Sequence, residues 1–204
     1  MPGWQFTTTS YVVPYVTDSV AATASVVAAV LATTQLTGSA GRLLGGRIAD
    51  RIPGTAVRGP ALVLAGQCAL AAVGFVEVVL SIGEAAAWIA FGFVCIFALG
   101  FPGVYDATMT AMVDDEVGGS TAGDQTALNT GGLVAPPLFG SLTETVGYDT
   151  GWTGLAVSSA VAAVAIRFSI ASDYSETSTS PVRSYSSVVA TLSAISDPNS
   201  RSVR

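Results

Sequence analysis

The chain has 204 residues, of which 50% are hydrophobic and only 11% are charged, with a formal net charge of −6. A soluble domain carries about 25% charged residues, and the mean hydropathy of +0.60 also argues against a water-soluble fold. The sequence has no histidine and no lysine, which excludes serine–histidine proteases, histidine-ligated metal sites and lysine-containing phosphate loops. We therefore expect an integral membrane protein that is not an enzyme, needs no cofactor or metal and binds no nucleic acid.

Residues 1–18 form the first segment. They hold a short apolar patch at 11–16 that follows a polar stretch at 7–10. Crossing the hydrocarbon core takes about 20 residues in a helix, so this patch is too short to span it. We expect a partial helix end on the extracytoplasmic side.

Residues 19–172 contain long uncharged runs, each near the ~20 residues that a spanning helix needs. These runs cover 19–41, 59–76, 85–105, 125–143 and 150–166. Alanine, glycine, serine and threonine fill them, and such small residues let membrane helices pack closely. The predicted fold class is an all-α integral membrane bundle with about five full transmembrane helices plus the partial one.

Residues 173–204 are rich in serine and threonine and poor in bulky apolar side chains. We expect a disordered cytoplasmic tail. The alternative is a helix lying in the membrane interface, because apolar side chains recur at helical spacing at Val182, Tyr185, Val189, Leu192 and Ile195.

The arginines orient the chain. All eight lie on one side of the topology that the apolar runs imply: Arg42, Arg47, Arg51, Arg58, Arg167, Arg183, Arg201 and Arg204. The positive-inside rule places that side in the cytoplasm. The prediction is a multi-pass protein of the cell membrane with its N-terminus outside and its C-terminus in the cytoplasm.

Polar side chains within the apolar runs are the candidates for a solute or ion pathway, namely Gln35, Gln67, Tyr105, Asp106, Gln125 and Asn129. An ionisable group inside a membrane is by default a functional site, which makes Asp106 a candidate for proton or cation coupling. The alternative for Asp106 is a solvated position at the inner interface. The alternative for Asn129 is a hydrogen bond between helices of the bundle.

Three stretches resemble parts of the major facilitator superfamily. GRIADR (46–51), preceded by the pair Gly41-Arg42, resembles the signature loop G-x-x-x-D-R/K-x-G-R, although IPG (52–54) replaces its last positions. GFPGVY (100–105) resembles the broken tenth helix of these transporters. The glycine-rich region around APPLFG (135–140), with Gly147 and Trp152 after it, resembles the eleventh helix and the loop that follows.

The resemblance covers residues 11–168, which would be helices eight to twelve and the outer end of helix seven. It implies a secondary active permease that moves a small solute by alternating access between two six-helix bundles. Arg42, Gly46, Asp50 and Arg51 would form the gating loop. There Asp50 would bond the start of the next helix and pair with an arginine; the alternative is that the arginines only set topology.

The chain has about half the length of such a transporter, so the resemblance implies a truncated or split half. Its expected partners are membrane lipid, a small-molecule solute and a separately encoded N-terminal half. The alternative is a non-transporting membrane remnant, or a structural or partner subunit that lacks the first six helices. The lysine-free, acidic and alanine-rich composition is typical of an organism that lives at high salt.

Overall fold

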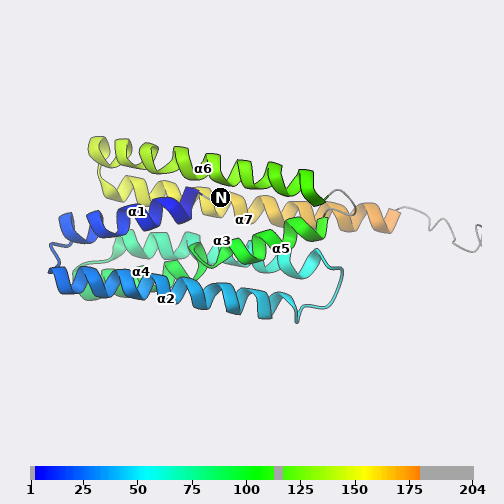
Figure 1. Ribbon diagram of the computed structural model, residues 1–204, viewed down its shortest axis with the longest axis horizontal. Coiled ribbons are helices and arrows are strands. Elements are labelled where there is room, and N and C mark those ends of the chain that lie inside the picture. Colours follow the sequence, from blue (N-terminus) through cyan, green and yellow to red (C-terminus); the bar gives the residue numbers. More distant parts are fainter. Residues whose placement is uncertain (1–2, 113–116, 180–204) are drawn as a thin grey trace, which may run out of the picture. The chain divides into compact units, whose positions relative to one another are not determined.

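The computed structural model describes residues 3–112 and 117–179. The chain divides into a unit of residues Met1–Ile170 and a second unit of Ala171–Arg204. In the described part, the regular structure is entirely helical (Figure 1). The helices are α1 (Gly3–Asp18), α2 (Ala24–Ala49), α3 (Arg58–Leu80), α4 (Glu84–Ala98), α5 (Phe101–Met112), α6 (Val117–Val146) and α7 (Tyr148–Thr179).

Short connections join α1 to α2, α3 to α4 and α6 to α7 at one end of the first unit, which we name the turn end (Figure 1). The Tyr15 hydroxyl donates to the Val78 carbonyl at 3.3 Å, and the Tyr148 hydroxyl lies 3.5 Å from the Asp18 carboxylate. Gly83 and Gly147 have φ of 84° and 100°, a left-handed conformation that glycine adopts without a steric penalty. The opposite end, with residues 50–57 and the last turns of α2 and α5, is the loop end.

Three stretches in the described residues are long and apolar enough to cross a membrane, and they are Arg58–Leu80, Glu84–Ala111 and Tyr148–Ser172. The second of these joins α4 and α5. α2 and α6 are more polar, because threonine, glutamine and arginine interrupt α2 and threonine, asparagine and glycine interrupt α6. The predicted all-α membrane class is confirmed.

The helix ends differ from the apolar runs. α2 begins at Ala24 and not at residue 19, because Ala21 adopts a positive φ of 55° that ends one helix before the next starts. α2 also continues to Ala49, past Arg42 and Arg47, which are both exposed. α1 is a 16-residue helix that includes Pro14 and buries Thr7 and Thr8.

α7 continues to Thr179, so its backbone is helical over the first residues of the segment expected to be a disordered tail. Residues 180–204 lie outside the described residues, and with them the possible interfacial helix and the last three arginines.

Aromatic side chains fill the core near the turn end. Trp152 is completely buried. Its ring centroid lies 4.9 Å from that of Phe139, 5.5 Å from Phe91, 5.7 Å from Tyr15 and 6.1 Å from Phe75. These partners come from α6, α4, α1 and α3. Aromatic pairs in this distance range add about 0.5–1.5 kcal/mol each beyond burial, so this cluster holds five helices together.

Candidate functional site

The span formed by α4 and α5 is broken at Leu99 and Gly100. Pro102 explains the break, because a proline ring clashes with the carbonyl four residues earlier and has no N–H to bond it. Leu99 is the C-terminal cap of α4, with its N–H donating to the Cys95 carbonyl. The broken helix predicted at 100–105 is therefore confirmed, with α5 beginning at Phe101.

α2 crosses this break at very short range. A Cβ added to Gly41 would lie 2.8 Å from the Ile96 carbonyl carbon and 3.2 Å from the Gly100 Cα, and it would overlap the Ile96 carbonyl oxygen. A Cβ on Gly38 would lie 2.7 Å from the Leu99 Cβ. Only glycine allows two helix backbones to approach this closely, so these glycines fix the position of α2 on the break.

Arg42 binds the break directly. Its Nε donates to the Leu99 carbonyl oxygen at 2.9 Å. The last carbonyls of a helix have no partner within the helix and carry the negative end of its dipole, which favours a cation there. Arg42 therefore joins α2 to the end of α4. The sequence identified Arg42 only as a member of the signature loop, and its carbonyl partner was not predicted.

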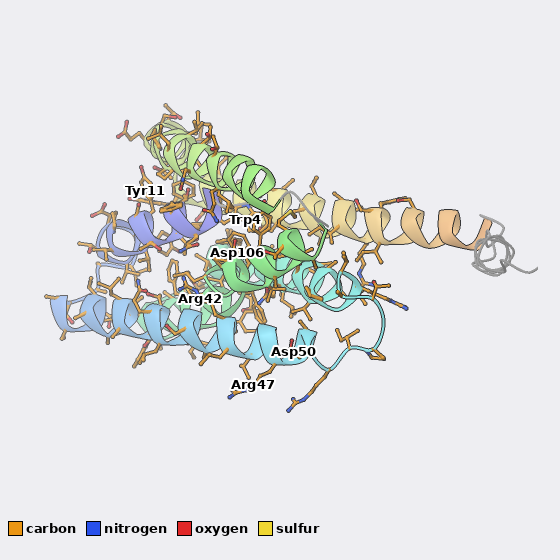
Figure 2. The ribbon with its side chains drawn as sticks, turned by 45° about the vertical axis from the view of Figure 1, so that its right-hand side comes forward. Trp4, Tyr11, Arg42, Arg47, Asp50 and Asp106 are labelled. Carbon is orange, nitrogen blue, oxygen red and sulfur yellow. The ribbon has the colours of Figure 1, made fainter. Side chains whose placement is uncertain are left out.

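The other signature residues lie beyond this crossing. A Cβ on Gly46 would meet no atom within 4 Å. Asp50 caps the C-terminus of α2, where its N–H donates to the Gly46 carbonyl at 3.0 Å. Its side chain is exposed, as is that of Arg51. Figure 2 shows Asp50 at the end of α2 and Arg47 projecting away from the helices.

The Asp50 carboxylate is not the cap of the next helix. The N-cap of α3 is Val57, without a side-chain cap bond, and the Arg58 N–H donates instead to the Thr55 hydroxyl at 3.3 Å. Among the described residues, no ion pair joins Asp50 to an arginine. Within this chain, the structure thus brings Arg42 to the helix break and leaves Asp50 and Arg51 at the surface.

Most of the predicted pathway residues are exposed on the helices. Gln35, Asp106, Gln125 and Asn129 are exposed, on α2, α5 and α6. Figure 2 places Asp106 on α5, beyond the helix break. Tyr105 is half-buried against the Phe101 ring, with centroids 5.9 Å apart.

Gln67 does not share this exposure. Its side chain is buried between α3 and α2, and its Nε2 lies 2.8 Å from the position that a Cβ on Gly45 would take. The position of Gln67 supports a packing role and not a pathway role.

Exposed polar residues form rows at helical spacing on three helices. Residues four apart lie on one face of a helix. The rows are Gln35 and Ser39 on α2, Asp106 and Thr110 on α5, and Gln125 and Asn129 on α6. α5 packs on both α2 and α6, so the three helices that carry the rows are neighbours.

α3 and α7 expose a different chemistry. Most of their exposed large side chains are apolar, namely Leu70, Val73, Val76, Leu80, Val157, Val161, Val164 and Phe168, and Arg58, Glu77 and Arg167 are among the charged exceptions. On α7 the residues 157, 161, 164 and 168 form one stripe at helical spacing. α3 and α7 therefore expose mainly apolar side chains, whereas α2 and α6 expose polar rows beside apolar side chains such as Leu36 and Leu133.

The polar residues lie at different depths along the helices. At 1.5 Å per residue, Gln35 lies about 17 Å from the start of α2 at the turn end, and Arg42 lies about 27 Å from it. Asp106 lies about 33 Å from the start of α4, and Asn129 about 26 Å from the end of α6. With a hydrocarbon core of ~30 Å, Gln35 is near mid-depth and Asp106 is near the boundary at the loop end.

Comparison with known proteins agrees with this architecture. The family model of the Major Facilitator Superfamily matches residues 3–199. Curated proteins give no match to the sequence. The family match spans almost the entire chain and includes the crossing, the helix break and the polar rows. The chain therefore belongs to the major facilitator superfamily, a family of multi-pass membrane transporters.

Proposed function

We propose that this chain forms one wall of the solute pathway in a secondary active permease. The observation that carries the proposal is the set of exposed polar rows. α2, α5 and α6 present rows of amide, hydroxyl and carboxylate groups, on α2 and α6 beside exposed apolar side chains such as Leu36 and Leu133, whereas the exposed side chains of α3 and α7 are mainly hydrocarbon. Polar side chains are costly against lipid, so the polar rows fit an aqueous path and the apolar surface fits the bilayer.

The depths of the polar residues suggest their roles. Gln35 lies near mid-depth and Asn129 lies deeper toward the loop end, and each has an amide that both donates and accepts hydrogen bonds. These two are our candidates for contact with a small polar solute. Asp106 and Gln125 lie near the loop end, which favours a place at the mouth of the pathway for Asp106 over a coupling site at the membrane centre.

We place the loop end in the cytoplasm and the turn end outside, because Arg42, Arg47, Arg51 and Arg58 all lie toward the loop end. One bundle provides only one wall, so transport needs a second bundle opposite the polar rows. Asp50 and Arg51 are exposed at the loop end. An exposed carboxylate and an exposed guanidinium are each suited to bind that second bundle in one of the two access states.

The decisive experiment is cysteine accessibility in sealed membrane vesicles. Gln35→Cys and Asn129→Cys test the polar rows, and Val161→Cys is the matched control on the apolar stripe. The native Cys68 and Cys95 are buried and give a low background. We expect a charged, membrane-impermeant thiol reagent to modify the first two variants at least tenfold faster than the control, because a charged reagent enters water and not lipid.

Equal rates at all three positions would refute an aqueous face on these helices and would favour a membrane protein without a transport pathway. A second test needs an assembly that transports. There, Asp50→Asn is expected to slow transport while leaving the amount of protein in the membrane unchanged. Unchanged transport would remove the gating role of Asp50 and leave the arginines as determinants of topology alone.

A further inference from the structure

A groove is lined by residues of α3 and α7, the two helices whose exposed side chains are mainly apolar. Its volume is about 220 Å³. Small residues of α3 form one wall, namely Ala65, Gly66 and Ala69, and the other wall includes Ala163, Arg167 and Phe168 of α7. At ~30 Å³ for a group the size of a water molecule, the groove has room for about seven such groups in a chain.

The groove faces lipid. Both of its helices are among the three stretches that are apolar enough to cross a membrane, and only 17% of the α7 stretch is buried within the protein. Val161 and Val164, beside the groove on α7, are exposed. A groove with apolar walls in such a surface is filled by hydrocarbon and not by water.

One end of the groove carries a positive charge. Arg167 lines it and is exposed, and no ion pair joins Arg167 to another described residue. Arg167 lies about 29 Å along α7 from Tyr148 at the turn end. That distance matches the ~30 Å core, so the guanidinium reaches the headgroup level while the groove extends from it into the hydrocarbon.

The two ends of the groove therefore have the chemistry of the two ends of a phospholipid. An arginine guanidinium offers a planar fork of donors that fits a phosphate. The small residues of α3 provide space for a chain, and a Cβ on Gly66 would meet no atom within 4 Å. We propose that the α3–α7 groove binds an anionic phospholipid, with one acyl chain between α3 and α7 and its phosphate on Arg167.

The experiment is native mass spectrometry of the purified full chain after titration with phosphatidylglycerol or phosphatidylcholine of the same acyl chains. For the unmodified chain we expect at least a fivefold preference for phosphatidylglycerol in the first bound lipid, since one arginine near the headgroups is worth about fivefold in affinity for anionic lipid. Arg167→Gln is expected to bring the two lipids to within twofold of each other.

Gly66→Leu tests the groove itself. Gly66 has open space around it, so leucine is expected to fill the groove without displacing either helix and to lower the occupancy of both lipids. Gly154→Leu is the matched control, because Gly154 is also a helical glycine with nothing within 4 Å of its Cβ position and does not line the groove. It is expected to bind lipid like the unmodified chain.

Equal binding of both lipids by the unmodified chain would overturn the proposal, as would Gly66→Leu behaving like Gly154→Leu. Binding of glycerol phosphate, which has no acyl chains, as tightly as phosphatidylglycerol would also overturn it, because the site would then be a plain anion site. None of these measurements depends on transport, so the result is independent of the proposed function.

Discussion

The crossing of α2 over the helix break makes a sharp prediction for Gly41→Ala. The new Cβ would overlap the Ile96 carbonyl oxygen and lie 2.8 Å from the carbonyl carbon, whereas carbon atoms in contact prefer about 3.5–4.0 Å, so α2 must move away by at least about 1 Å. A movement of this size along the bond lengthens the 2.9 Å bond from Arg42 to Leu99 to about 3.9 Å or more, beyond the range of a hydrogen bond.

The magnitude follows from three effects. Overpacking destabilises by about 1–3 kcal/mol, and loss of a hydrogen bond from a charged group by about 1.5–3 kcal/mol. Replacing glycine by alanine within a helix stabilises the helix by about 1 kcal/mol, which offsets part of this loss. The net loss is about 1.5–5 kcal/mol, with a central value near 3 kcal/mol. For a chain of this size, the central value of about 3 kcal/mol corresponds to a fall of about 6–12 °C in melting temperature.

Gly46→Ala is the matched control for this prediction. Gly46 lies on the same helix, and its Cβ position has no neighbour within 4 Å. Alanine at this position therefore has the higher helix propensity without causing a steric clash. We expect it to raise the melting temperature by up to about 4 °C. The assay is thermal unfolding in one detergent, followed by tryptophan fluorescence. Gly41→Ala melting within 2 °C of Gly46→Ala would refute the reasoning about the crossing.

Other substitutions test the remaining contacts by the same assay. Arg42→Gln removes the charged hydrogen bond to the end of α4 and is expected to destabilise the protein by about 1.5–3 kcal/mol. Its control is Arg47→Gln on the exposed face, which should change stability by less than about 0.5 kcal/mol. Equal effects of the two substitutions would contradict the assigned role of Arg42. Trp152→Ala opens the core at the turn end and should lower stability by about 3–5 kcal/mol, with a smaller loss arguing that the aromatic cluster does not join the helices. Gly147→Ala places a side chain at φ of 100° and is expected to cost about 1–3 kcal/mol, while Gly154→Ala on a regular helix should be neutral or stabilising.

Much of the fold was predictable because the bilayer imposes a length on every spanning helix. The runs at 59–76 and 150–166 lie within α3 and α7, and Pro102 indicated the break between α4 and α5. The ends were less predictable. α2 starts late because of a turn at Ala21, and it continues past Arg42 and Arg47. Counting uncharged residues misses both effects. A helix can continue through an arginine that binds a backbone carbonyl, as Arg42 does, or that extends from an exposed face, as Arg47 does.

The geometry of the candidate site was not predictable from the sequence. Polar residues within apolar runs were the candidates for a pathway, but sequence alone did not distinguish the buried Gln67 from the exposed Gln35. The partner of Arg42 is a backbone carbonyl. Every residue has a carbonyl, so no sequence pattern marks the one that a side chain binds. The lining of the α3–α7 groove likewise depends on how two distant helices pack.

The break between α4 and α5 divides one membrane span into two helices. Both pack on α2 and α3, but Phe91 also fixes α4 in the aromatic cluster with Trp152, whereas α5 also contacts α6. α5 has 12 residues, which makes it about 18 Å long. A tilt of about 10° at Gly100 would therefore carry its far end about 3 Å sideways while the rings around Trp152 stay in place. The break at Leu99 and Gly100 is therefore the point about which α5 can tilt, while the hydrogen bond from Arg42 to the Leu99 carbonyl holds the end of α4 against α2.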